Sequence, residues 1–160
     1  MKAALASMFA LALVVSIAHA AGNHGVHVQA DRIGDAIELK GAGAFDGAFA
    51  TLNGKFRVTR DIPAGPLGGL RDGDSGHWKA TQVLPTSGFK CAGPDAVKDV
   101  FSDDDTIVFQ ADFFRQGDGN RASFSAKVFI SAQDEDPATP GIQNVWIQGV
   151  GCDQVVVDLR

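Results

Sequence analysis

Residues 106–131 read TIVFQADFFRQGDGNRASFSAKVFIS, and this stretch decides the fold. Two segments of alternating apolar and polar residues, 106–115 and 121–131, flank the turn-forming sequence GDGN at 117–120. A period of two places successive side chains on opposite faces of a strand, so the pattern predicts a β-hairpin. We expect one face of its second strand to be buried, and the residues on that face are Phe124, Ala126, Val128 and Ile130.

Short alternating segments continue outward from this hairpin in both directions. Asn53-Gly54, the preferred pair for a two-residue type I′ turn, lies between segments 48–52 and 55–60 and predicts another hairpin. Residues 31–40 fit a helix and a strand equally well, and residues 94–101 predict one or two turns of helix beginning near a proline. Further strands are expected at four places, namely 26–30, 77–84, 144–150 and 154–159.

Glycine and proline separate these segments, with 19 glycines and 6 prolines in 160 residues. Many short strands joined by such turns are typical of an all-β fold. We expect a single-domain antiparallel β-sandwich over residues 21–160, with an immunoglobulin-like arrangement or a small barrel as the alternatives. The sequence contains no internal repeat and no low-complexity tract that would suggest a second domain.

Residues 1–20 have the features of a signal peptide. Lys2 supplies a short positive region, residues 5–17 are largely apolar, and Ala18-His19-Ala20 predicts cleavage before Ala21. The apolar run is too short for a membrane span, which needs about 20 residues. We therefore expect an exported protein, located in the periplasm or outside the cell, with no insertion into a membrane.

The chain has two cysteines, Cys91 and Cys152, and both follow the predicted cleavage site. In an oxidising compartment, two cysteines most simply form one disulfide. The sequence contains no C-x-x-C motif that would indicate a redox or metal-binding thiol pair. We predict that Cys91 and Cys152 are joined.

The charge distribution argues against a nucleic acid partner. The formal net charge is −5 at pH 7, and the sequence contains no cluster of lysine and arginine. Nucleic acid binding relies on clustered positive charge. We therefore expect no nucleic acid partner.

Several acidic residues cluster in predicted loops, and the candidates for a calcium site are Asp103, Asp104, Asp105, Asp134 and Asp136. Calcium takes six to eight oxygen ligands from flexible loops. Two such loops meeting at one end of the sandwich would form a weak site, although the spacing is not that of an EF-hand. Aspartate is also common in turns for purely local reasons, so solvated turn residues are the alternative. No other cofactor is expected.

The aromatic residues suit a core better than a wet recognition surface, because the chain has 11 phenylalanines and 2 tryptophans but no tyrosine. Trp78 and Trp146 lie within alternating runs, so we expect them to be buried. Phe113 and Phe114 are adjacent, so one of them must face away from the core. Phe129 lies between Val128 and Ile130, so its side chain points to the opposite face of the strand from theirs. Such outward residues either pack under a second layer or mark a partner surface.

No catalytic set emerges from the sequence. Gly73-Asp74-Ser75-Gly76 matches the residues around the nucleophile of trypsin-like proteases, but the match stops there, and His77 is expected simply to face solvent. We therefore expect an exported non-enzymatic binding or interaction protein with a protein or carbohydrate ligand. The alternatives are a small secreted hydrolase with an unrecognised site and a structural surface or matrix subunit.

Overall fold

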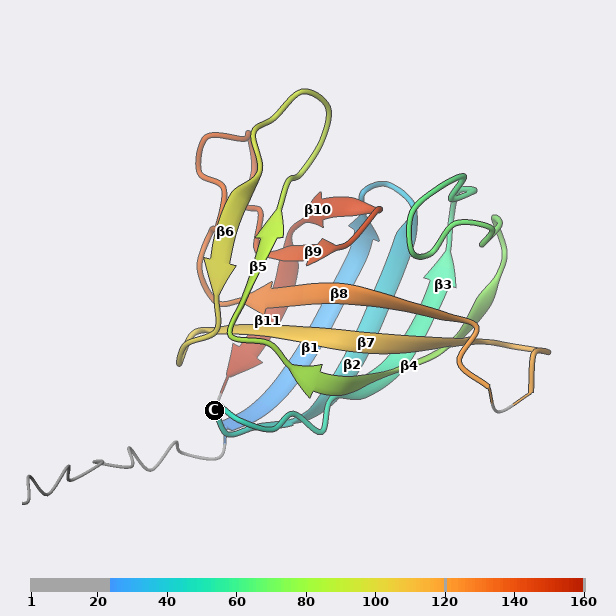
Figure 1. Cartoon of the computed structure of the whole chain (residues 1–160), viewed down its shortest axis with the longest axis horizontal. Helices are drawn as coiled ribbons and strands as arrows, with labels where there is room; N and C mark the ends of the chain where they lie inside the picture. Colours follow the sequence, from blue (N-terminus) through green and yellow to red (C-terminus); the bar gives the residue numbers. More distant parts are fainter. Residues whose placement is uncertain (1–23, 120, 160) are drawn as a thin grey trace, which may run out of the picture.

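The computed structural model describes residues 24–119 and 121–159 (Figure 1), so the predicted signal peptide and Asn120 of the predicted turn lie outside the described residues. These residues form eleven strands, which are β1 (His24–Ile33), β2 (Ile37–Phe45), β3 (Asn53–Val58), β4 (Ser75–Val83), β5 (Thr86–Phe89), β6 (Lys98–Phe101), β7 (Thr106–Arg115), β8 (Phe124–Ser131), β9 (Val145–Ile147), β10 (Gly151–Asp153) and β11 (Val155–Leu159). No helix in this part of the chain is long and apolar enough to cross a membrane.

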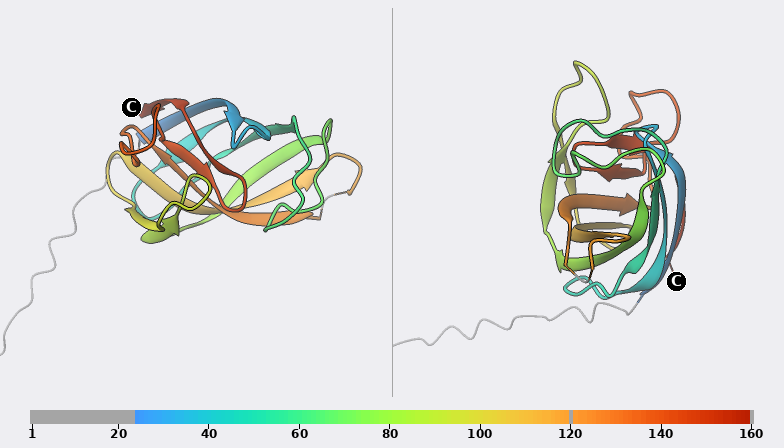
Figure 2. Two further views of the ribbon diagram at one scale, coloured as in Figure 1. Left: turned by 90° about the horizontal axis from the view of Figure 1, so that it is seen from above. Right: turned by 90° about the vertical axis from the view of Figure 1, so that its right-hand side faces the viewer.

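Nine strands form one antiparallel sheet in the order β10-β9-β8-β7-β4-β3-β2-β1-β11. β7 and β8 cross in front of β1, β2 and β3 (Figure 1), and the view along the molecule shows the sheet curling round on itself (Figure 2, right). The side chains inside the curled sheet form the main apolar core. The edge strands β10 and β11 are consecutive in the chain, with only Gln154 between them. The expected all-β fold is confirmed, and its form is a sandwich closed into a nearly complete small barrel.

Asn144 closes this barrel from a buried position between β8 and the two edge strands. Its Nδ2 donates to the carbonyl oxygens of Ser131 and Val155, each at 3.1 Å. Its Oδ1 accepts from the backbone N–H of Val155 at 2.7 Å. One side chain therefore joins β8 to β11, which are not neighbours in the sheet order of the described strands.

The hairpin at 106–131 forms as predicted, with β7 and β8 paired from Thr106↔Ser131 to Phe113↔Phe124. Ala126, Val128 and Ile130 are fully buried in the main core, and Phe124 is partly buried against it. Trp78 is also buried in this core, as expected.

A second layer covers the outer face of β8 and β9. β5 and β6 form a separate two-stranded sheet. Between this sheet and the barrel lies a second apolar cluster that contains Phe129, Trp146, Phe89 and Val100. The outward Phe129 therefore packs under a second layer, and Trp146 is buried as expected.

The disulfide between Cys91 and Cys152 is present, with its Cα atoms 4.7 Å apart. Cys91 follows β5 and belongs to the second apolar cluster, while Cys152 lies in the edge strand β10. The bridge therefore fastens the outer layer to the edge of the barrel. A disulfide is compatible with an exported protein.

The predicted turn at Asn53-Gly54 is wrong, because both residues lie within β3. Gly54 is paired with Gly41 on one side and with Trp78 on the other. A Cβ on Gly54 would lie 1.8 Å from the carbonyl oxygen of Lys40, so glycine serves the close approach of two strands here. The chain reverses earlier, where Asp46 Oδ1 accepts from the N–H groups of residues 48 and 49.

The predicted helix at 94–101 is also wrong, because residues 98–101 form β6. The strand directs Val100 into the second apolar cluster, and this tertiary packing outweighs the local helix signal. Residues 31–40 adopt the strand alternative as the end of β1, a turn and the start of β2, with Gly34 and Asp35 at positive φ in the turn. β5 and β10 were not predicted, because three or four residues are too short for a clear alternating pattern.

Candidate functional site

An open groove of about 760 Å³ lies over β3, β4, β7 and the loop that follows β7. Lys55, Ser75, His77, Phe114 and Gln116 are among its lining residues. The groove combines an aromatic residue, an imidazole, an ammonium, a hydroxyl and an amide within one concave surface. It is therefore the site where we consider ligand binding.

The alternation of three adjacent strands brings these side chains together. Lys55 on β3 is directly opposite His77 on β4, and His77 is directly opposite Phe114 on β7. Their neighbours Phe56 and Trp78 point into the core. Burying the inner residues of each strand thus forces Lys55, His77 and Phe114 to the outer face.

His77 and Phe114 form a stacked pair on this outer face. Their ring centroids are 4.6 Å apart and the ring planes differ by 4°. His77 is exposed, as expected, and Phe114 is partly exposed. Of the adjacent pair, Phe113 is buried in the core, so Phe114 is the residue that faces away from it.

Hydrogen bonding orders the polar side of the groove. Ser75 Oγ donates to Gln116 Oε1 at 3.3 Å. The backbone N–H of Gln116 also donates to the carbonyl oxygen of Ser75 at 2.8 Å. These bonds hold the hydroxyl and the amide side by side at the start of β4 and the end of β7. Among the described residues nothing accepts a hydrogen bond from the Gln116 amide nitrogen or the Lys55 ammonium, and both residues line the groove, so these groups are available as donors.

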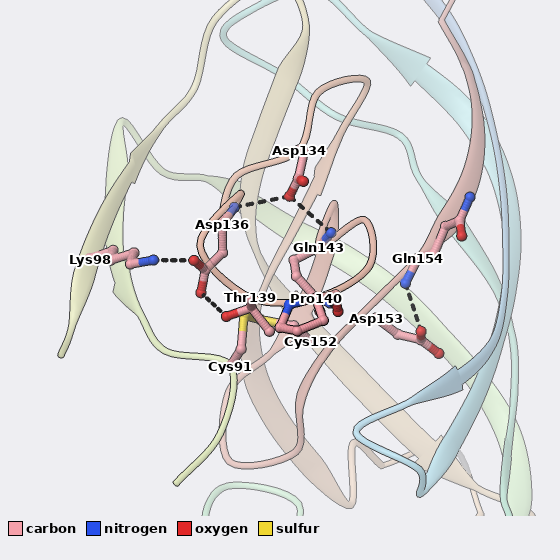
Figure 3. The surroundings of a disulfide bond; sticks show 10 residues. All are labelled: Cys91, Lys98, Asp134, Asp136, Thr139, Pro140, Gln143, Cys152, Asp153 and Gln154. Atoms are coloured by element: carbon pink, nitrogen blue, oxygen red, sulfur yellow. Dashed lines mark hydrogen bonds and ion pairs between the residues drawn. A yellow bond between two sulfur atoms is a disulfide. The ribbon is translucent and has the colours of Figure 1, made fainter. Parts of the chain in front are cut away.

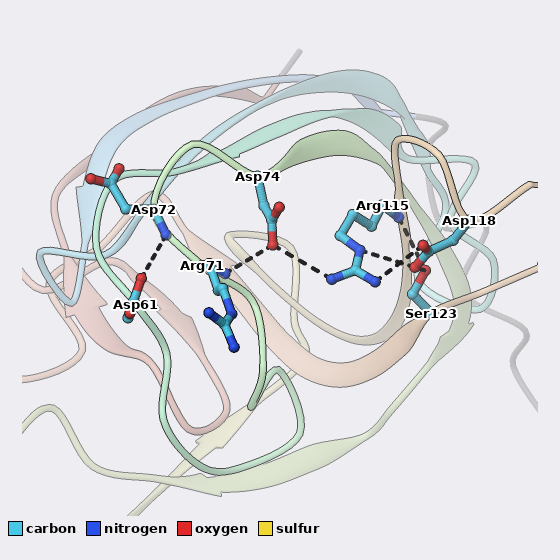
Figure 4. Close-up of polar contacts among 7 residues, drawn as sticks. All are labelled: Asp61, Arg71, Asp72, Asp74, Arg115, Asp118 and Ser123. Carbon is cyan, nitrogen blue, oxygen red and sulfur yellow. Dashed lines mark hydrogen bonds and ion pairs between the residues drawn. The ribbon is translucent and has the colours of Figure 1, made fainter.

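Arg115 anchors the loop that forms the end of the groove (Figure 4). Its guanidinium donates to both carboxylate oxygens of Asp118, at 3.0 and 3.1 Å, and lies 3.7 Å from Asp74. Ser123 Oγ donates to Asp118 at 2.7 Å. The hydrogen bond from Arg115, followed by that from Ser123, holds the pKa of Asp118 below its ordinary value. These bonds join Arg115, at the end of β7, to Asp118 and Ser123 on the other side of Gly117.

The two acidic loops proposed for calcium do meet at one end of the barrel. The backbone N–H of Ala132 donates to the carbonyl oxygen of Asp105, and Gln133 Nε2 donates to its Oδ2, both at 2.8 Å. Asp103 Oδ1 accepts from the N–H of Asp105, and Asp104 is exposed. The contact between the loops is thus made through amide donors.

The remaining two calcium candidates lie beside the disulfide (Figure 3). Asp134 Oδ1 accepts from the N–H groups of Asp136 and Gln143. Asp136 is 1% exposed and pairs with Lys98, which is the main reason that the pKa of Asp136 is lowered. Within residues 24–119 and 121–159, no group of three or more His, Cys, Asp or Glu residues is placed to hold a metal ion. Calcium binding stays a prediction.

Comparison with protein families, with curated proteins and with solved structures gives no match.

Sequence reasoning missed most of the groove. Lys55, Ser75 and Gln116 come from separate segments, and the short protease-like match at 73–76 that includes Ser75 does not indicate a binding groove. The outward positions of Lys55 and Ser75 were readable from the alternation around Phe56 and Trp78, whereas Gln116 follows the end of β7. Which strands lie next to one another is a property of the sheet order, and that order was not readable from the chain.

Proposed function

We propose that the protein is an exported, non-enzymatic carbohydrate-binding protein whose ligand occupies the groove over β3, β4 and β7. The observation that carries this proposal is the solvent-accessible His77–Phe114 stack set among the polar groups of Lys55, Ser75 and Gln116. Sites for small ligands typically combine apolar and aromatic walls with a few placed polar groups.

The chemistry of the groove suits a sugar ring. The C–H groups of a pyranose contact an aromatic ring favourably, because they meet its negatively charged face. The hydroxyl groups of the sugar both donate and accept, and Ser75, Gln116 and His77 side chains can do the same. Lys55 adds a donor that cannot accept. The bonds from Arg115 and Ser123 to Asp118 are made without a ligand, so the end of the groove that they hold contributes little to the entropic cost of binding.

The state of the nearby carboxylates favours binding over hydrolysis. Glycoside hydrolysis uses a carboxylic acid with a raised pKa as the proton donor. Asp118 and Asp74, the carboxylates that contact Arg115 at the end of the groove, are paired with its guanidinium. That pairing lowers the pKa of Asp118, which is opposite to what a proton donor requires.

A binding screen with a matched pair of variants tests this proposal. The purified protein is applied to an array of neutral and acidic oligosaccharides, and titration calorimetry then measures the affinity for those retained. Phe114→Ala should weaken binding at least about tenfold, as expected for an aromatic anchor at the centre of a site. Phe49→Ala is the control, because Phe49 is 75% exposed in the loop after β2 and does not line the groove.

The array has three informative outcomes. Binding that Phe114→Ala reduces and Phe49→Ala does not supports the proposal. Binding that both variants leave unchanged, or an array with no retained sugar, overturns it. Release of a reducing end from a retained oligosaccharide would favour the hydrolase alternative. Export is tested separately by sequencing the N-terminus of the protein from the cell envelope or medium, which should begin at Ala21.

A further inference from the structure

Four cations gather on the outer face of the sheet beside the groove. Lys40 on β2, Lys55 and Arg57 on β3, and Lys79 on β4 are all exposed. We call these four residues the cationic face. They occur in three different strands, so the sequence shows no basic run, and only the pairing of β2, β3 and β4 assembles them.

The register places two of these lysines directly opposite each other. Lys40 is paired with Lys55, and Lys55 is in turn paired with His77. Lys79 lies diagonally across from Lys55, because residue 79 is opposite Asn53. Like charges directly opposite on neighbouring strands destabilise a sheet.

Nearby acids do not relieve this repulsion by direct contact. Glu38 is opposite Arg57, and Asp112 is opposite Lys79. Neither cation forms an ion pair with its acidic neighbour, and across the part of the chain that the structure describes, ion pairs involve Arg32, Lys98 and Arg115 instead. A protein of net charge −5 thus carries a local excess of positive charge on one wall.

We propose that the cationic face and the groove together bind an acidic polysaccharide laid across β2, β3, β4 and β7. This inference rests on the proposed function and names its ligand class. The row from Lys40 through Lys55 and His77 to Phe114 crosses three strand spacings, about 14 Å, which accommodates more than one sugar ring. Carboxylate or sulfate groups of the polysaccharide contact Lys40, Lys55, Arg57 and Lys79, while one of its sugar rings lies against Phe114.

Two other anionic partners fit the surface less well. A membrane-binding face usually adds large apolar side chains to its cations. The exposed large apolar residues of the described chain are Phe49, Val97, Phe101, Ile142 and Val156, and none of them is in β2, β3 or β4. Nucleic acid binding depends on clustered lysine and arginine that neutralise many phosphates, whereas this face has four cations with Glu38 and Asp112 among them. A polysaccharide can also use its hydroxyl groups to bind Ser75 and Gln116 in the groove.

The experiment compares two polymers that share a backbone and differ in charge, and adds a second uronate polymer with a different backbone. Binding of polygalacturonate, of its methyl-esterified form and of alginate is measured by calorimetry, with a single-stranded oligonucleotide and phosphatidylglycerol vesicles as the other anionic probes. The variants are Lys55→Glu, Phe114→Ala and the control Lys90→Glu. Lys90→Glu changes the net charge equally, but Lys90 follows β5 and lies outside the cationic face.

We expect at least one of the two uronate polymers to bind, with an affinity that falls as salt rises because the contacts are exposed. Lys55→Glu should weaken that binding about tenfold or more, and Lys90→Glu should change it less than about twofold. Lys55→Glu should also melt no lower than the wild type, because the introduced carboxylate would be opposite Lys40 and replace repulsion with attraction. Loss of binding in this variant therefore cannot be attributed to unfolding.

The outcomes separate this inference from the proposed function. Equal binding of polygalacturonate and its methyl ester, sensitive to Phe114→Ala but not to Lys55→Glu, overturns the acidic ligand and leaves carbohydrate binding intact. Absence of any binding that depends on Phe114 overturns both. Tighter Lys55-dependent binding of the oligonucleotide or of the vesicles than of the uronate polymers overturns the polysaccharide class.

Discussion

Replacement of Asn144 by alanine should open the barrel at its closure. The substitution removes three hydrogen bonds, two donated to the carbonyl oxygens of Ser131 and Val155 and one accepted from the Val155 N–H. Val155 and Asn144 are both buried, so water does not readily replace the lost partners. The edge strand β11 then keeps its ladder with β1 but loses the link to β8 that the Asn144 side chain provides.

The size of the effect follows from these bonds. Each neutral hydrogen bond contributes about 1 kcal/mol, and a buried donor left without an acceptor costs about 1–3 kcal/mol. We therefore expect Asn144→Ala to lower the free energy of unfolding by about 3 kcal/mol. For a domain of this size, that corresponds to a fall of roughly 10 °C in melting temperature.

Urea unfolding and amide hydrogen exchange measure the two parts of this prediction. Urea unfolding reports the loss of stability. Amide exchange should accelerate most in β11, because without the Asn144 link this strand can separate from the barrel while the rest of the protein stays folded. Asn53→Ala is the matched control, since Asn53 is exposed and its side chain donates one bond, to the carbonyl oxygen of Thr51. A melting temperature of Asn144→Ala within about 2 °C of that of Asn53→Ala would refute the reasoning.

Four further predictions concern the bridge, the core, the buried ion pair and the acidic loops. Cys152→Ser should lower the free energy of unfolding by about 2–5 kcal/mol in denaturant titrations, because the bridge spans 61 residues, and wild type with the bridge reduced should match it. Val128→Asp places a carboxylate in the core at a residue that is 1% exposed and should cost several kcal/mol; a thermal melt close to that of the wild type would mean that the faces of β8 are misassigned. The Lys98 hydrogen bond lowers the pKa of Asp136 below its ordinary value of 3.8, so the ion pair stabilises the folded protein above pH 3.8 and this contribution is lost as the pH falls further. The difference in melting temperature between wild type and Lys98→Met should therefore be widest near neutral pH and should narrow below pH 3.8. The calcium hypothesis for residues 103–105 predicts about 2.7 kcal/mol of stabilisation at a hundredfold excess of calcium over Kd, and coincident melts in calcium, magnesium and chelator would end it.

The sequence alone determined the strand content around 106–131 and the disulfide. Alternation along β7 and β8 assigned Ala126, Val128 and Ile130 to the core correctly, because the period of two is a local property of an extended chain. The pairing of Cys91 with Cys152 followed from their number, since two cysteines leave only one intramolecular bridge.

Only the tertiary structure decided the features that depend on which strands are neighbours. Asn53-Gly54 has the local chemistry of a turn, yet both residues lie within β3. Gly54 allows β2 to approach closely on one side and is paired with Trp78 of β4 on the other. The groove and the cationic face arise in the same way, from side chains that are far apart in sequence and adjacent across a ladder. Local propensities differ by about 1 kcal/mol or less, whereas burial of a large side chain contributes more, so packing across the sheet prevails where the two conflict.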